Sequence, residues 1–214
     1  MNVSDMINVM KTLGIGQVYS DDETNQIFLT FLNLANDQLY SETANINSGI
    51  FVIDPLITSN INENSIELSE IPFSISKVYP IGKTKELKGK SVLDFSDYQF
   101  ENTSPGDPIF YTNIGKDISF WPFVNDISYN FKVIYTPERS ELILETPESE
   151  IPYPVSYHRV LVDGALYYLF QDESGFKNPR KENAAMERWD KGRADLKSYF
   201  YGSNNMLIRT FENA

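Results

Sequence analysis

Few residue types in this chain can carry out chemistry. Its 214 residues contain one histidine, His158, and no cysteine, which removes thiolate nucleophiles, disulfides and cysteine-bound zinc together. A catalytic triad or a histidine-based metal site would need His158 beside a nucleophile or further ligands, and no local motif supplies them. We therefore interpret His158 as an ordinary partly buried or helix-capping residue, and we predict no catalytic residue.

Three short motifs resemble ligand sites but lack the required spacing. Residues 14–16 (Gly-Ile-Gly) have no strand before them and no Gly-Lys-Ser/Thr after them, so we interpret them as a helix end and a turn. The acidic clusters at residues 21–23 and 94–97 lack the twelve-residue pattern of a calcium loop, and we interpret them as caps or turns. The sequence predicts no metal site, no cofactor and no enzymatic turnover.

Helical spacing of apolar residues occurs at both ends of the chain. It predicts helices over residues 5–13 and from about 20 to 40, with Ser4 as the N-cap of the first helix and a capping box of Ser20 and Glu23 at the second. Two further helices are predicted from the prolines at 152 and 154 to about 172, and from 179 to 201. Asn178 is the expected N-cap of the last helix, and Gly202 its end.

Two glycines, Gly164 and Gly192, lie inside the last two predicted helices, where each costs up to about 1 kcal/mol relative to alanine. Close approach of the two helices would explain both glycines. Tolerance at an exposed site is the alternative.

Between residues 49 and 147 the period of the apolar residues changes to two, which indicates strands. The predicted strands are residues 50–53, 65–68, 73–80, 108–111, 118–121, 129–135 and 141–146. We predict an α+β fold: a helical bundle formed by the N- and C-terminal helices, with an inserted domain like a β-sandwich or barrel. The expected domain boundaries are residues 1–48 and 151–202 for the bundle, 49–150 for the β-rich domain and 203–214 for a C-terminal arm.

The charge is distributed unevenly. The chain carries a net charge of −12, yet from residue 175 onward eight basic residues face five acidic ones. An acidic body disfavours general binding to nucleic acid. A basic last helix on such a body suits head-to-tail self-association, and we predict lateral contacts through Arg188, Lys191 and Arg193. A solvated helix face is the alternative. No apolar run approaches the roughly 20 residues of a membrane span.

The last two predicted helices resemble the C-terminal helical pair of head-to-tail adaptor proteins of tailed, especially short-tailed, bacteriophages. The resemblance lies in residues 151–173, which begin Ile-Pro-Tyr-Pro, in residues 184–189 with their Trp, and in residues 196–200. Residues 7–14 also look like the N-terminal helix of that family and its Leu-Gly end. Together these segments cover about half of the chain, and the family has no catalytic residue to carry over.

The resemblance implies a homo-oligomeric ring, a dodecamer, under the portal protein at the head-to-tail interface of the virion. Such a ring extends the DNA channel without binding DNA specifically, offers a platform for tail or nozzle proteins, and is assembled in the host cytoplasm. A carbohydrate- or receptor-binding module is the alternative, because aromatic residues gather around 110–123. Exposure of Trp121 would favour that module. A hydrolase without a recognisable motif is a more distant alternative.

The last twelve residues are unusual for a loose chain end. After the polar residues 203–205, which we expect to form a hinge, five residues suit an arm that binds the portal or a neighbouring subunit: Met206, Leu207, Ile208, Arg209 and Phe211. In this hypothesis Leu207 and Phe211 are the anchors, and Arg209 pairs with an acidic partner. The alternative is that the segment folds back onto its own bundle.

Overall fold

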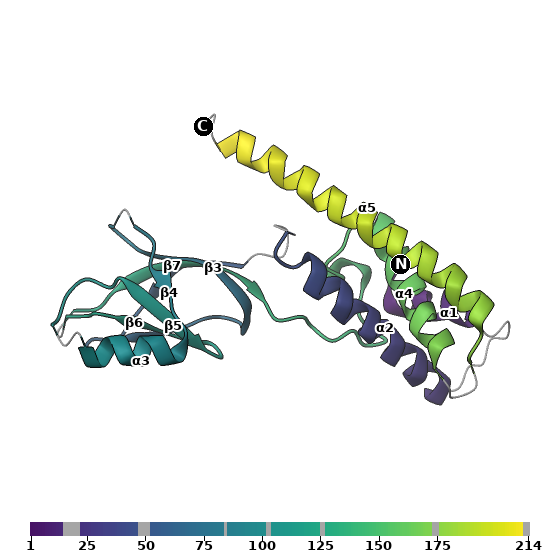
Figure 1. Cartoon of the computed structure of the whole chain (residues 1–214), viewed down its shortest axis with the longest axis horizontal. Coiled ribbons are helices and arrows are strands. Elements are labelled where there is room, and N and C mark those ends of the chain that lie inside the picture. Colours follow the sequence, from purple (N-terminus) through teal and green to yellow (C-terminus); the bar gives the residue numbers. More distant parts are fainter. Residues whose placement is uncertain are drawn as a thin grey trace. The chain divides into compact units, whose positions relative to one another are not determined.

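The computed structural model describes residues 1–14, 22–46, 52–83, 85–101, 104–124, 127–172 and 176–211, with the side chains of 52–55 and 203–211 left aside. The chain divides into two compact units (Figure 1). One comprises Met1–Gly49 with Arg139–Ala214, and the other comprises Ile50–Glu138. N- and C-terminal helices pack together, and two small sheets are inserted between them in sequence. This confirms the predicted α+β fold.

The described residues of the helical unit form four α-helices: α1 (Val3–Gly14), α2 (Asp22–Thr43), α4 (His158–Gln171) and α5 (Pro179–Phe211). Two 3₁₀ turns, η2 (Glu148–Glu150) and η3 (Val155–Tyr157), precede α4. The prolines at 152 and 154, where the helix was expected to begin, therefore lie before α4, and Val155, inside the predicted helix, is exposed in η3. Figure 1 shows α5, in yellow, running along α4, in green.

Side-chain caps explain where two of these helices begin. The amide of Asp5 donates to Oδ1 of Asn2 at 2.8 Å, and the amide of Asn2 donates back to Asp5. The cap of α1 is therefore Asn2 and not Ser4, and α1 begins at Val3; asparagine is as good an N-cap as serine. Asn178 caps α5 as predicted, because its Oδ1 accepts the amide of Lys181 at 3.1 Å. Ser20 of the predicted capping box lies outside the described residues.

Helix α4 is the centre of the helical unit. Its residues from Val160 to Leu166 are all buried, in contrast to the one-sided burial of a surface helix. The same core cluster contains residues of the other three helices: Met6 and Met10 of α1, Phe28 and Leu32 of α2, and Trp189 of α5. The two ends of the chain therefore share one core.

The two internal glycines lie where α4 and α5 approach each other. A Cβ atom on Gly164 would lie 2.7 Å from the ring of Trp189, and one on Gly192 would lie 2.7 Å from Val160. Such distances are shorter than van der Waals contact, so any larger residue would push the helices apart. The close-approach interpretation is confirmed at both positions.

Where the structure describes it, the inserted unit has two sheets and one helix. Strands β1 (Val52–Thr58), β7 (Asn130–Pro137) and β3 (Pro72–Pro80) form an antiparallel sheet in that order. Strands β2 (Ser65–Glu67), β6 (Asp117–Trp121), β5 (Phe110–Ile114) and β4 (Lys88–Gly89) form the second sheet, in which only the described β4–β5 pair is parallel. Helix α3 (Val92–Glu101) packs beside this unit's β5.

The core of the inserted unit follows the alternation in the sequence. Phe131, Val133 and Tyr135 of β7 are fully buried, and Ile118 and Phe120 of β6 meet them in the same cluster. The rings of Phe120 and Phe131 lie 4.8 Å apart between centroids. Period-two alternation thus correctly predicted which side chains enter this core.

Residues 141–146 are not a strand, although their alternation predicted one. Leu142 is buried, but its amide donates to Oδ1 of Asn33, and its carbonyl accepts from Nδ2 of the same side chain, both at 2.9 Å. A side-chain amide of α2 thus replaces the neighbouring strand that a β-ladder would need.

Two further expectations in the inserted unit were wrong. Residues 94–97 lie in α3, whose first turn is capped by Oγ of Ser91 at 3.1 Å from the amide of Asp94. The helix was missed because Phe95 is its only buried residue, so it has no apolar stripe that faces its own core. Lys88 and Gly89, where no strand was predicted, pair with β5 as β4.

The last helix does not end at Gly202, because α5 continues to Phe211. A glycine inside a helix costs about 1 kcal/mol, which is too little by itself to end a helix of 33 residues. The expected hinge at residues 203–205 is therefore helical.

A substitution at the α4–α5 crossing tests how much the fold depends on the close approach. We expect Gly164→Ala to lower the free energy of unfolding by about 1–3 kcal/mol, because the added methyl group overlaps the ring of Trp189. Urea denaturation followed by circular dichroism measures the change. The matched control is Gly202→Ala on the same α5, where an added Cβ meets nothing within 4 Å. There alanine should be neutral or stabilising by up to about 1 kcal/mol. Equal effects at both positions would contradict the packing argument.

Candidate interaction surfaces

His158 is a structural residue of the helical unit. Its ring is fully buried, with Nε2 2.9 Å from the carbonyl oxygen of Tyr153 and Nδ1 3.0 Å from that of Met1. These two contacts tie the start of α4 to Tyr153, in the segment before α4, and to Met1, in the segment before α1. Across the described ranges, no group of three or more His, Cys, Asp or Glu side chains could hold a metal ion. No described helix is long and apolar enough to cross a membrane.

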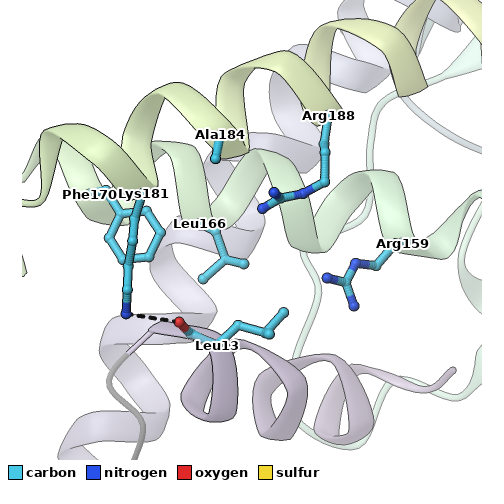
Figure 2. Close-up of a pocket in the computed structure, with 7 residues that line it drawn as sticks. All are labelled: Leu13, Arg159, Leu166, Phe170, Lys181, Ala184 and Arg188. Carbon is cyan, nitrogen blue, oxygen red and sulfur yellow. Dashed lines mark hydrogen bonds between the residues drawn. The ribbon is translucent and has the colours of Figure 1, made fainter.

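A groove lies between α1, α4 and α5 (Figure 2). Its main cavity has a volume of about 310 Å³. Leu13, Leu166, Phe170 and Ala184 line it with apolar groups, and a smaller depression continues from Leu13 along α1. Three cationic side chains complete the lining: Arg159, Lys181 and Arg188. We call this feature the cationic groove.

The cations of the groove are held in place by partners in their own chain. The buried carboxylate of Asp163 lies 2.8 Å from Nε of Arg188 and 3.5 Å from Nε of Arg159. Nζ of Lys181 donates to the carbonyl oxygens of Leu13 and Gly14, where a cation stabilises the C-terminal end of α1. Three positive charges therefore face one carboxylate at this site.

The two arginines of the groove retain unused donors. Asp163 engages each through Nε, and neither has another carboxylate partner in the described part of the chain. About half of each side chain is exposed, 46% for Arg159 and 48% for Arg188. Figure 2 shows both guanidinium groups directed toward the same side of the cavity. Such paired donors suit a carboxylate.

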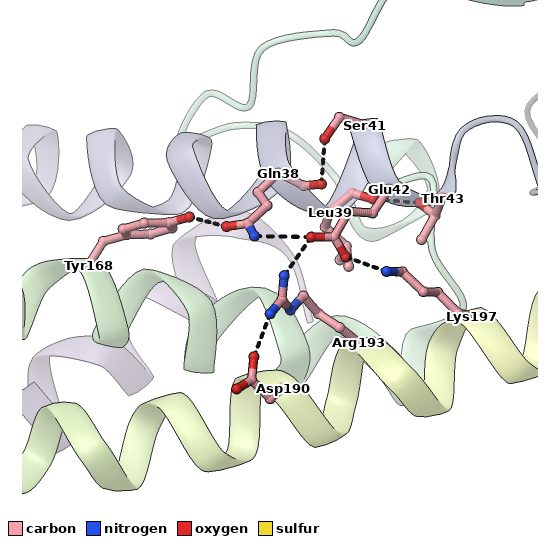
Figure 3. Close-up of polar contacts among 9 residues, drawn as sticks. All are labelled: Gln38, Leu39, Ser41, Glu42, Thr43, Tyr168, Asp190, Arg193 and Lys197. Atoms are coloured by element: carbon pink, nitrogen blue, oxygen red, sulfur yellow. Dashed lines mark hydrogen bonds and ion pairs between the residues drawn. The ribbon is translucent and has the colours of Figure 1, made fainter.

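A second cluster of charges joins α2 to α5 (Figure 3). Glu42 near the end of α2 pairs with Arg193, and its other oxygen lies 2.7 Å from Nζ of Lys197. Gln38 donates to Glu42 at 3.0 Å and itself accepts from the hydroxyl of Tyr168 on α4. We call this cluster the Glu42 network.

The remaining contacts of Arg193 keep it in the same place. Asp190 pairs with its other terminal nitrogen, and its guanidinium carbon lies 5.0 Å from the ring centroid of Trp189. A planar guanidinium suits such a stacked position. The network thus fixes α5 against α2 at a point adjacent to the central core.

Charge pairing in the network lowers the pKa of Glu42. Burial acts to raise this pKa, but hydrogen bonds from Lys197 and Gln38 and the charges of Arg193 and Lys197 outweigh it. The folded protein therefore favours the ionised carboxylate.

The structure separates the three residues predicted to make lateral contacts. Arg188 lies in the cationic groove, and Arg193 is held in the Glu42 network. Lys191 is exposed and has no ion pair with any described residue. Arg159 and Lys181 were not predicted as site residues, because the apolar residues beside them in the predicted helices indicated the core of the bundle. The spacing of Arg159 and Asp163, four residues apart on one helix, was the available signal.

In the inserted unit, the most exposed apolar side chains lie on α3. Phe100 is 84% exposed and Leu93 is 78% exposed. Trp121, in contrast, is half-buried, and its ring packs edge-on against Phe123 with centroids 5.4 Å apart.

The residues predicted to form the C-terminal arm lie in the last turns of α5. They are Met206, Leu207, Ile208, Arg209 and Phe211, and their side chains are outside the described part of the structure. Residues 212–214 are also outside it.

The fold is thus a helical bundle that is interrupted in sequence by a small β unit. Residues 1–207 match the SU10 adaptor protein family, and the chain belongs to this family of phage head-to-tail adaptors. The protein is therefore a structural component of a phage virion and not an enzyme, as the resemblance of its terminal helices implied. No curated protein sequence matches the chain.

The Glu42 network predicts a pH-dependent stability. Because the pKa of Glu42 is lowered on folding, its contribution is complete above the unfolded value of 4.5 and disappears as the pH falls through the folded pKa. At neutral pH we expect Glu42→Gln to lower the free energy of unfolding by about 1–3 kcal/mol, since Arg193 and Lys197 lose their carboxylate.

Urea titrations at a series of pH values measure this dependence. The deficit of Glu42→Gln relative to the wild type should shrink as the pH falls through the lowered pKa of Glu42 in the folded protein, because the wild-type carboxylate then becomes protonated too. Glu187→Gln, an exposed carboxylate on α5, should remain close to the wild type throughout. A deficit that stays constant down to low pH would mean that the charge of Glu42 is not what stabilises the contact.

Proposed function

We propose that the protein assembles side by side into a dodecameric ring under the portal, extends the DNA channel and offers a platform for tail components. Membership of an adaptor family places partners at the head-to-tail junction. The observation that carries the ring is the cationic groove, an apolar cavity with unused guanidinium donors on a chain whose net charge is −12. Unlike surfaces on one subunit make head-to-tail contacts, which close into rings.

The acidic composition supports a passive DNA channel. A net charge of −12 leaves little attraction for phosphates, so a ring of such subunits would let a duplex pass without holding it. No base-reading motif is present in the sequence.

The exposed face of α3 supports the role of the inserted unit as a platform. Leu93 and Phe100 place large apolar groups in water, and exposed apolar groups of this size mark sites of protein contact. Tail or nozzle proteins are the partners we propose for this face. A carbohydrate platform is less well supported, because Trp121 is half-buried and its ring packs edge-on against Phe123.

The end of α5 is the proposed attachment to the portal. Leu207 and Phe211 are four residues apart in a helical segment, which places them one turn apart. We propose that these two residues anchor the segment, with Met206 and Ile208 beside them and Arg209 paired with a portal carboxylate.

Native mass spectrometry and electron microscopy test the ring directly. With the purified protein and its portal, we expect closed particles of twelve copies stacked on the portal. Chains that remain monomeric both alone and in the presence of the portal would contradict the proposal.

Truncation after Gly202 tests the portal attachment. We expect the truncated protein to unfold at nearly the wild-type temperature and to lose binding to portal-bearing heads, because the removed residues would contact the partner. Leu207→Ala with Phe211→Ala should reproduce the loss, while the matched control Thr210→Ala should bind normally. A truncated protein that is several degrees less stable and still binds would assign the segment to its own bundle.

A further inference from the structure

The segment that leads from the inserted unit back to α4 is acidic and presents one isoleucine. Residues 141–150 contain four glutamates and no basic residue. Ile143 is 53% exposed, and Glu141 and Glu145, two residues away on either side, are also exposed. We call residues 141–150 the acidic loop.

The acidic loop is held in a defined conformation. Leu142 is anchored by the two hydrogen bonds to the side chain of Asn33. Ile143 and Thr146 close a tight turn, with the amide of Ile143 2.9 Å from Oγ1 of Thr146 and the amide of Thr146 3.0 Å from the carbonyl oxygen of Ile143. Just before the loop, Arg139 pairs with Asp37. The exposed Ile143 is therefore presented with little conformational entropy left to lose on binding.

The cationic groove has the complementary composition. Its apolar wall of Leu13, Leu166 and Phe170 can receive an aliphatic side chain, and a cavity of about 310 Å³ has room for one. The unused donors of Arg159 and Arg188 lie beside that wall, where a carboxylate next to the inserted side chain would meet them.

We propose that the cationic groove of one copy binds the acidic loop of a second copy. Ile143 enters the cavity, and Glu141 and Glu145 pair with Arg159 and Arg188. The two surfaces share no residue, so each subunit can use both at once and the contact can repeat around a ring. The contact deepens the proposed function, because it rests on ring assembly and names the surfaces that make it.

Charge and the conformation of the acidic loop identify this loop, from a second copy, as the occupant of the cationic groove. The groove has three cations and one carboxylate, whereas the loop has only carboxylates. The loop also carries an exposed aliphatic group between two of these carboxylates, which is the arrangement that the groove requires. Every copy of the chain presents both surfaces, so one gene product supplies both sides of the contact.

Two variants block one surface each. Ala184→Glu places a carboxylate inside the groove four residues before Arg188, a spacing that favours the helix while it fills the cavity. Ile143→Ser with Glu145→Lys removes the side chain and reverses one charge of the loop. The matched control, Leu34→Ser with Asp195→Lys, also removes an exposed apolar group and reverses an exposed charge in the helical unit.

Sedimentation velocity and mass photometry compare the full-length proteins, after circular dichroism and urea unfolding have shown each variant to be folded. Alone, each blocked variant should be monomeric, with a contact weakened roughly 30-fold or more. The control and the wild type should form rings. A mixture of the two blocked variants should form dimers only, because the intact loop of one meets the intact groove of the other and no further contact is possible.

The outcomes separate this contact from ring assembly itself. Blocked variants that form normal rings would overturn the contact and leave the proposed ring intact. Folded, monomeric variants that do not form dimers on mixing would show that the two surfaces do not meet each other. Loss of portal binding by Ala184→Glu with normal rings would assign the groove to the portal instead. A wild type that never forms rings would remove the proposed function itself.

Discussion

The near-contact of α4 and α5 is the constraint on which the helical unit depends. Gly164 lets the ring of Trp189 lie against the α4 backbone, and Gly192 lets Val160 lie against α5. A buried tryptophan contributes several kcal/mol of core burial, but only if its partner surface has no side chain in the way. Because α4 is buried all round, its position also determines where α1 and α2 can pack.

The same crossing distributes the charges of α5 between two surfaces. Lys181 and Arg188 come to lie in the cationic groove with α1 and α4, whereas Arg193 and Lys197 meet Glu42 of α2. The second set neutralises itself inside the subunit and contributes to its stability. The first set is only partly neutralised by Asp163, so it retains capacity for a partner. The basic residues of α5 thus serve two separate purposes.

The inserted unit shows a comparable division between its own core and its surface. Its sheets bury alternating aromatic and aliphatic residues, and α3 adds the buried Phe95 and the ring of Tyr98, which lies 4.5 Å from that of Phe110 between centroids. The rest of the apolar surface of α3 remains exposed. In an adaptor family protein, apolar groups that do not stabilise their own fold are available to other virion components.

The sequence by itself determined that helices at both ends of the chain enclose a β-rich insertion, because helical and strand periodicities report local burial. It also predicted the N-cap at Asn178 and the adaptor resemblance, and it offered close approach as one of two explanations for the internal glycines. It misassigned residues 141–146 and missed α3, since both depend on what lies across from them: an amide from Asn33, or the exposure of most side chains of the helix. It also ended α5 at Gly202, although the helix continues to Phe211. Only the tertiary structure decided which cations are paired. Periodicity gives the face on which Arg159, Arg188 and Arg193 lie, but not the distance to Asp163 or Glu42, and charge pairing depends on that distance.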